Sequence, residues 1–191
     1  MEIDESIVQL GAKLDEWFDA SQATFASQDR EAQGKALLRG FAIAKELDRL
    51  KADGLAAITA LLNRRETVTD AERAASLTRG FEFAAKLKHT LRDELADTDG
   101  ANEIVGLMNE IVNALDGIGS GRAALAVLLD HPDTGVRASA AAYLVDLMPD
   151  RVVPLLREID QKESGSSADF TAHWALLDWE LKQKAEQNKP D

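Results

Sequence analysis

Histidine is the residue type most often used for acid–base chemistry and for metal binding near neutral pH. The chain has three histidines, His89, His131 and His173, and more than 40 residues separate each from the next. None belongs to a His-Glu-x-x-His motif, which would place two zinc ligands and a base on one helix. We therefore predict no catalytic histidine, no metal centre and no cofactor, and we interpret His131 as a turn residue.

Two short motifs resemble ligand loops only in part. The glycine-rich run Gly117–Gly121 follows a predicted helix instead of a strand, and no Lys-Ser or Lys-Thr pair completes a phosphate loop. We interpret it as a joint between helices. The run Asp97–Gly100 suggests a calcium loop, but its first and twelfth positions would be Leu95 and Gly106, which supply no carboxylate.

Acidic residues gather between positions 93 and 116, a span that contains neither lysine nor arginine. Such clustering is typical of a solvated surface, and it also suits a docking surface for a basic partner. Carboxylate pairs could do acid–base work, but nothing in the span positions a nucleophile beside them. The candidate partner-binding residues here are Asp93, Glu94, Asp97, Asp99, Glu103, Glu110 and Asp116.

Composition narrows the class of protein. The 191 residues carry 22 Lys and Arg against 34 Asp and Glu, a formal net charge of −12. Such a surface repels the phosphate backbone, so we do not expect a nucleic-acid ligand. The chain has no cysteine, which excludes disulfides and thiolate chemistry. An acidic N-terminus without an apolar core, and no apolar run near the ~20 residues of a membrane span, predict a cytoplasmic protein that does not bind membranes.

Helical periodicity runs through the whole chain, and we expect an all-α protein of about eight helices with no strand. The first helix is expected from Ile3 to about Ala26, and a second ends near Leu50. The pair Asp53-Gly54 is taken as a break before a short third helix over residues 55–62. A Thr-x-x-Glu capping box at Thr69–Glu72 opens a fourth helix that runs to about Leu95. Further helices cover Ile104–Leu115 and Arg122–Leu129, and others follow Pro132.

The last helix has two apolar rows about half a turn apart. Phe170, Trp174, Leu177 and Leu181 are predicted to form the stripe that faces the core. Trp179 lies nearly opposite Phe170. We expect it to be buried against the preceding helix pair, and the alternative is a partly exposed anchor for a partner.

An internal repeat with an offset of 40 residues relates positions 37–47 to positions 77–87. Its matched glycines are Gly40 and Gly80, which are unusual inside helices. Close approach of neighbouring helices at both positions would explain them. A period near 40 is found in two-helix HEAT-type repeats, although low-complexity helices also agree by chance.

Residues 123–179 resemble HEAT-like repeat proteins. The resemblance rests on Asp133, Val136 and Arg137 and on the Ala140, Ala141 and Leu144 that follow. It implies that Arg137 bonds back to the turn between helices and has a structural role. The segment also resembles a small bacterial HEAT-like domain family that closes with Leu-x-x-Trp, here Leu176–Trp179. Related helical-repeat proteins often act as immunity proteins beside polymorphic toxins.

The expected architecture is therefore a set of helical hairpins in a short HEAT-like α-solenoid. Residues 1–120 would form N-terminal hairpins, residues 121–186 the HEAT-like segment and residues 187–191 a frayed tail, together one continuous domain. The expected function is protein binding without catalysis, most concretely as an immunity protein that sterically neutralises a basic toxin domain. A general scaffold, a homo-oligomer, and a helical-repeat enzyme acting on nucleic acid remain as alternatives, and net acidity argues against the last of these.

Overall fold

The computed structural model describes residues 2–25, 30–63, 68–119, 121–162 and 165–187, and in the first two helices it describes the side chains of residues 5–17 and 45–63. These residues form helices without any strand, which confirms the all-α prediction. The elements are α1 (Glu2–Phe25), α2 (Arg30–Asn63), α3 (Asp70–Leu95), α4 (Thr98–Asp116), the 3-10 helix η1 (Gly121–Asp130), α5 (Thr134–Leu144), α6 (Pro149–Lys162) and α7 (Ser167–Gln187).

The chain divides into two compact units, and two of the three boundaries between them fall inside helices, one in α3 and one in α4. The first unit comprises Met1–Thr67 and Arg79–Met108, and the second comprises Val68–Thr78 and Asn109–Asp191. Each unit therefore contains part of α3 and part of α4. The expected change at residue 120 from N-terminal hairpins to a HEAT-like segment, within one continuous domain, stays a prediction, and residues 109–119 lie in the same unit as those that follow.

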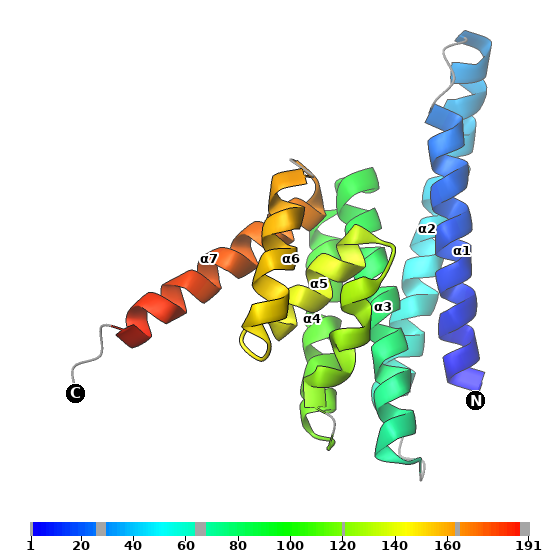
Figure 1. Cartoon of the computed structure of the whole chain (residues 1–191). Helices are drawn as coiled ribbons and strands as arrows, with labels where there is room; N and C mark the ends of the chain where they lie inside the picture. The colour runs from blue at the N-terminus through cyan, green and yellow to red at the C-terminus, as the bar shows by residue number, and fades with distance from the viewer. Residues whose placement is uncertain (1, 26–29, 64–67, 120, 163–164, 188–191) are drawn as a thin grey trace. The chain divides into compact units, whose positions relative to one another are not determined.

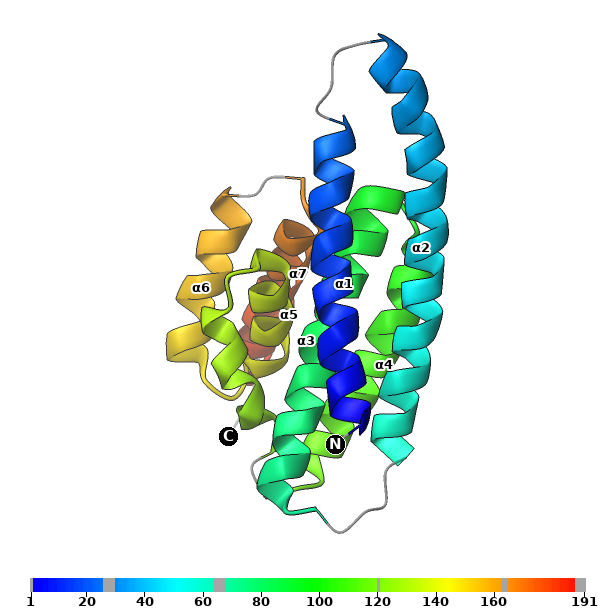
Figure 2. The same ribbon diagram turned by 90° about the vertical axis from the view of Figure 1, so that its right-hand side faces the viewer.

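In the first unit, α1 and α2 lie side by side as a long hairpin (Figures 1 and 2). The buried side chains of α1 are Ile7, Leu10, Leu14 and Trp17, whose alternating spacing of three and four residues is that of a coiled-coil seam. Leu47, Leu50, Ile58 and Leu61 are the buried residues of α2. The Lys86 ammonium lies 3.0 Å from Oδ2 of Asp15 and so connects α3 to α1.

The predicted break at Asp53-Gly54 is wrong, because α2 continues through it to Asn63. Gly54 is buried, and a Cβ at this position would collide with the ring of Phe83 from α3. The glycine therefore allows close packing of two helices instead of ending one. Gly80 is buried inside α3, whereas the surroundings of Gly40 in α2 lie outside the described residues, so the 40-residue repeat stays a prediction.

In the second unit, α5 packs against η1, α6 and α7. Small buried residues (Gly135, Ala138, Ser139, Ala140 and Ala141) cover much of its surface and let its neighbours come close. The start of α5 is fixed by Asp133, whose Oδ1 accepts a hydrogen bond from the backbone N–H of Val136 at 2.8 Å. Val136 itself is fully buried.

Arg137 holds the turn that precedes α5. Its Nη1 donates to the carbonyl oxygens of His131 and Pro132 at 2.7 and 2.8 Å, and its Nη2 donates to Oγ1 of Thr134 at 2.8 Å. Arg137 thus makes the hydrogen bonds back to the turn that the resemblance implies, and its contribution to stability stays a prediction. His131 is a turn residue as predicted, since its Nδ1 accepts from the backbone N–H of Asp133 at 3.0 Å.

Candidate functional site

Helix α7 has two apolar faces, and the structure reverses the predicted roles of the two. Its buried residues are Ser167, Ala168, Ala172 and Leu176, and Trp179 on the same side is half-buried. Phe170, Trp174, Leu177 and Leu181 are exposed by 47%, 52%, 37% and 56%. We call these four residues the α7 stripe.

The prediction that the α7 stripe faces the core is therefore wrong. Periodicity identifies apolar rows on a helix but does not say which row meets a neighbour. The small residues of α5 leave room for a close helix, and α7 turns its own small residues, Ala168 and Ala172, to the buried side. The bulky row is left in contact with solvent.

The aromatic members of the stripe are arranged as interacting rings. The ring centroids of Phe170 and Trp174 are 5.9 Å apart with planes at 60°, an edge-to-face arrangement. His173 packs at the edge of Trp174 with a centroid distance of 6.1 Å. About half of each aromatic surface and of each leucine surface is exposed, so the stripe presents roughly 350 Å² of apolar area. That is the size of patch that often marks an interaction site on a monomer.

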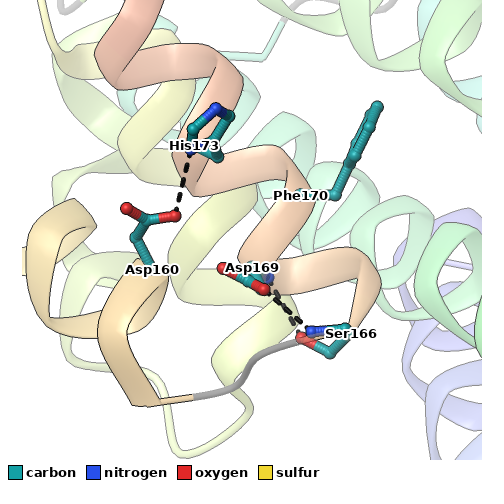
Figure 3. Close-up of a pocket in the computed structure, with 6 residues that line it drawn as sticks. Asp160, Ser166, Asp169, Phe170 and His173 are labelled. Atoms are coloured by element: carbon teal, nitrogen blue, oxygen red, sulfur yellow. Dashed lines mark hydrogen bonds and ion pairs between the residues drawn. The ribbon is translucent and has the colours of Figure 1, made fainter.

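A pocket of about 250 Å³ adjoins the N-terminal end of the stripe and is lined by Asp160, Gly165, Ser166, Asp169, Phe170 and His173 (Figure 3). Oγ of Ser166 accepts from the backbone N–H of Asp169 at 3.0 Å and caps α7. Oδ2 of Asp169 accepts from the backbone N–H of Gly165, whose φ of +98° suits glycine.

The pocket holds one histidine–carboxylate pair, with Nδ1 of His173 lying 3.3 Å from Oδ1 of Asp160. Ser166 is directed toward Asp169 and lies apart from His173 (Figure 3), so these side chains do not form the hydrogen-bonded chain of a Ser-His-Asp triad. In the described residues the pocket is a polar site at the N-terminal end of the α7 stripe.

In the first unit, the acidic span is partly neutralised by a lysine that is distant in sequence. Lys51 Nζ lies 3.5 Å from Oδ2 of Asp97 and 3.5 Å from Oε2 of Glu103. Asp97 also caps α4, because its Oδ1 accepts from the backbone N–H of Gly100 at 2.8 Å. Asp97 and Glu103 thus have roles within the fold, which the span alone could not reveal because Lys51 comes from α2.

In the second unit, Asp116 at the end of α4 forms a two-point ion pair with Arg122 at the start of η1, so the two ends of the glycine-rich joint are bonded to each other. Nε of Arg122 lies 2.9 Å from Oδ1 and 3.1 Å from Oδ2, and Nη2 also bonds Oδ2. The hydrogen bond from Arg122 lowers the pKa of Asp116 below its usual value. Gly121 has a φ of +56° at the end of this joint. The interpretation of Gly117–Gly121 as a joint is confirmed.

Of the other acidic candidates, Asp93, Asp99 and Glu110 are exposed and Glu94 is half-buried. Asp93 also attracts the Lys88 ammonium, which leaves Asp99 in the first unit and Glu110 in the second as the exposed acidic residues best placed to meet a partner.

Sequence reasoning missed a buried charge in α3. Lys88 is only 7% exposed, and His89 and Thr90 beside it are buried too. Burial, with a smaller contribution from Arg92, lowers the pKa of Lys88 to about 8, and Asp93 opposes the shift. The sequence does contain a sign that Lys88 is buried. It lies between Leu87 and Leu91 in a helix that has apolar residues on several faces.

Across the described ranges, no group of three or more histidine and carboxylate side chains could hold a metal ion. Nor does any helix in these ranges combine the length and the apolarity needed to cross a membrane. Comparisons of the chain with protein-family profiles, with curated proteins and with solved structures give no match, so the structure must supply the argument for function.

Proposed function

We propose that this chain is a protein-binding module that acts by occupying a partner's surface and not by catalysis. The observation that supports this best is the α7 stripe, with four large apolar side chains exposed in one row. A helix that is apolar on two opposite faces is normally covered on both of them. In the described structure only the face with Ala172 and Leu176 is covered.

The more specific form of this proposal is an immunity protein that binds and blocks a cognate toxin. It rests on the resemblance of residues 123–179 to HEAT-like proteins and on the net charge of −12, which would attract a basic toxin domain. In this form the chain would be a short HEAT-like solenoid. The turn geometry of Asp133 and Arg137 agrees with that arrangement.

The toxin would first meet exposed carboxylates, for which Asp99 and Glu110 are the best candidates. Reversal of their charge (Asp99→Lys with Glu110→Lys) should slow association and reduce its dependence on salt, because steering acts on the association rate. Reversal of an exposed acidic residue on α2, Asp48→Lys, is the matched control. An unchanged association rate in the double variant would refute the acidic docking surface. It would leave open binding through the α7 stripe, which the Trp174→Glu variant tests separately.

Co-purification from native cells tests the general proposal. The tagged protein is compared with Trp174→Glu, and with Val127→Glu as the control, since Val127 is an exposed apolar residue of η1 outside the stripe. We expect a stoichiometric partner with the native chain and the control, and its loss from Trp174→Glu. A partner that is basic and encoded next to this protein supports the toxin form, whereas several unrelated partners favour a scaffold. Equal recovery of all bound proteins by Trp174→Glu would contradict the proposal.

A further inference from the structure

We propose that the α7 stripe binds the α7 stripe of a second copy of this chain, with the two helices antiparallel about a two-fold axis. This inference rests on the proposed role of α7 in protein binding and names the partner of that face. The acidic residues Asp99 and Glu110 are not part of it.

The spacing of the stripe is that of a helix–helix seam. Phe170, Trp174, Leu177 and Leu181 are separated by four, three and four residues, which is the d-a-d-a pattern of a heptad repeat. The buried residues Ala172 and Leu176 lie on the other side of the helix, against the rest of its own unit. In Figure 1 the C-terminal end of α7 projects beyond α5 and α6, although Glu180 in this half lies 3.8 Å from Arg157 of α6. Leu177 and Leu181 of the seam are both exposed.

The order of the side chains favours an antiparallel pair. The two aromatic residues occupy the N-terminal half of the seam, and the two leucines occupy the C-terminal half. Antiparallel pairing places Phe170 against Leu181 of the second copy and Trp174 against Leu177 of the second copy, so that every layer joins a large ring to an aliphatic side chain. Parallel pairing would instead put the two Trp174 indoles in one layer and two leucines in the next. Antiparallel helix dipoles also attract each other.

The charges beside the seam are complementary in the same register. His173 and Glu180 lie at the same edge of the seam, where they contact Asp160 and Arg157 of α6 in their own copy. In the antiparallel pair this edge meets its equivalent, so His173 would also lie near Glu180 of the second copy. Lys184 follows Leu181 on the seam and would reach the pocket of the second copy that Asp160 and Asp169 line. In a parallel pair, Lys184 would instead lie beside Lys184 of the second copy, which carries the same charge.

The apolar area suits a concentration-dependent dimer. Two stripes of roughly 350 Å² would bury about 700 Å² of apolar surface, and the polar edges of the helices would add to it. The apolar part alone lies below the roughly 1,200 Å² at which stable interfaces begin, in the range of weak and transient contacts. We therefore expect association in the micromolar range.

Sedimentation of the purified full chain between about 1 and 200 μM tests the inference. The native chain and Val127→Glu should shift with concentration from the 20.8 kDa monomer toward twice that mass, and Trp174→Glu should stay monomeric over the whole range. A native chain that is monomeric at every concentration would overturn the inference. So would a dimer that Trp174→Glu leaves intact, because it would use another surface.

Spin labels on single cysteines test the orientation, and the chain has no native cysteine to interfere. The two-fold axis would pass between Trp174 and Leu177, so labels at Asp178→Cys should lie close together. Labels at Gln187→Cys should be about 35 Å apart, given a rise of 1.5 Å per residue. A parallel pair would give short distances at both sites and would contradict the proposed arrangement.

The two proposals can fail separately. If the purified chain is monomeric but Trp174→Glu still loses a different protein in co-purification, the second copy is the wrong occupant and protein binding through α7 stands. If the purified chain is monomeric and Trp174→Glu retains every bound protein, both are wrong.

Discussion

Replacement of the buried Lys88 by methionine should stabilise the protein near neutral pH. Methionine keeps the unbranched shape of the side chain and removes the charge. Lys88 is 7% exposed, and its pKa falls from the ordinary lysine value of 10.5 to about 8 in the fold. A difference of this size corresponds to about 3 kcal/mol of unfavourable free energy for the charged form in the folded state.

The lowered pKa of Lys88 also determines how the stability of the protein changes with pH. Because the folded pKa is the lower one, the unfolded state binds more protons between about pH 8 and 10.5, and the native protein gains stability as pH rises through this window. The advantage of Lys88→Met should thus be largest at pH 7, at up to about 3 kcal/mol, and should shrink toward zero near pH 10.5. The pKa of about 8 already includes the opposing attraction of Asp93, so this figure needs no further correction for the lost contact.

Urea unfolding followed by circular dichroism at pH 7, 8, 9 and 10 measures this effect. The difference between variant and native protein cancels the titration of all other groups to first order. Lys13→Met, on the exposed side of α1, is the control, and we expect it to change the free energy of unfolding by less than about 0.5 kcal/mol. A destabilised Lys88→Met protein at pH 7, or a difference that does not vary with pH, would refute the reasoning.

Substitutions at three further positions test the packing and the turns by chemical denaturation. Arg137→Lys should lower the free energy of unfolding by about 2 kcal/mol, because the single nitrogen of an ammonium cannot take the places of both Nη1, which bonds the two turn carbonyls, and Nη2, which bonds Thr134. A change under about 0.5 kcal/mol would contradict this role. Asp133→Ala removes the cap of α5 and should cost about 1 kcal/mol, whereas Asp133→Asn should cost less. Gly54→Ala would improve helix propensity by about 1 kcal/mol but forces the buried Phe83 ring to move, so we expect a net loss of about 1–2 kcal/mol. A stabilised Gly54→Ala protein would show that the ring adapts freely.

The features that depend on local sequence could be predicted. The capping box at the start of α3 is present, since the backbone N–H of Thr69 donates to Oε2 of Glu72 at 2.9 Å. The Asp133 cap and the Arg137 contacts are equally local, because every partner lies within six residues. Such interactions are set by side-chain type and spacing alone.

The features that depend on neighbours in space could not be predicted. Gly54 has the same local signal whether it ends a helix or meets a ring such as Phe83, and only the packing of α3 decides. The choice between the two apolar faces of α7 likewise depends on the small residues that α5 presents. The neutralisation of Asp97 and Glu103 needs Lys51, which lies far away in sequence.

The candidate binding surface therefore differs from the one that the sequence predicts. Trp179, a possible exposed anchor on sequence grounds, is half-buried with the covered face of α7, and the large exposed residues are those that periodicity assigns to the core. A row of exposed aromatic and aliphatic side chains is a stronger sign of protein binding than an acidic span whose members partly bond within the fold.

The most direct test of protein binding through α7 is quantitative co-purification in cells that express a tagged and an untagged copy of the chain together. We predict that the native protein and Val127→Glu recover bound protein, including the untagged copy, and that Trp174→Glu loses it. Recovery of the same proteins in the same amounts by Trp174→Glu would contradict the account.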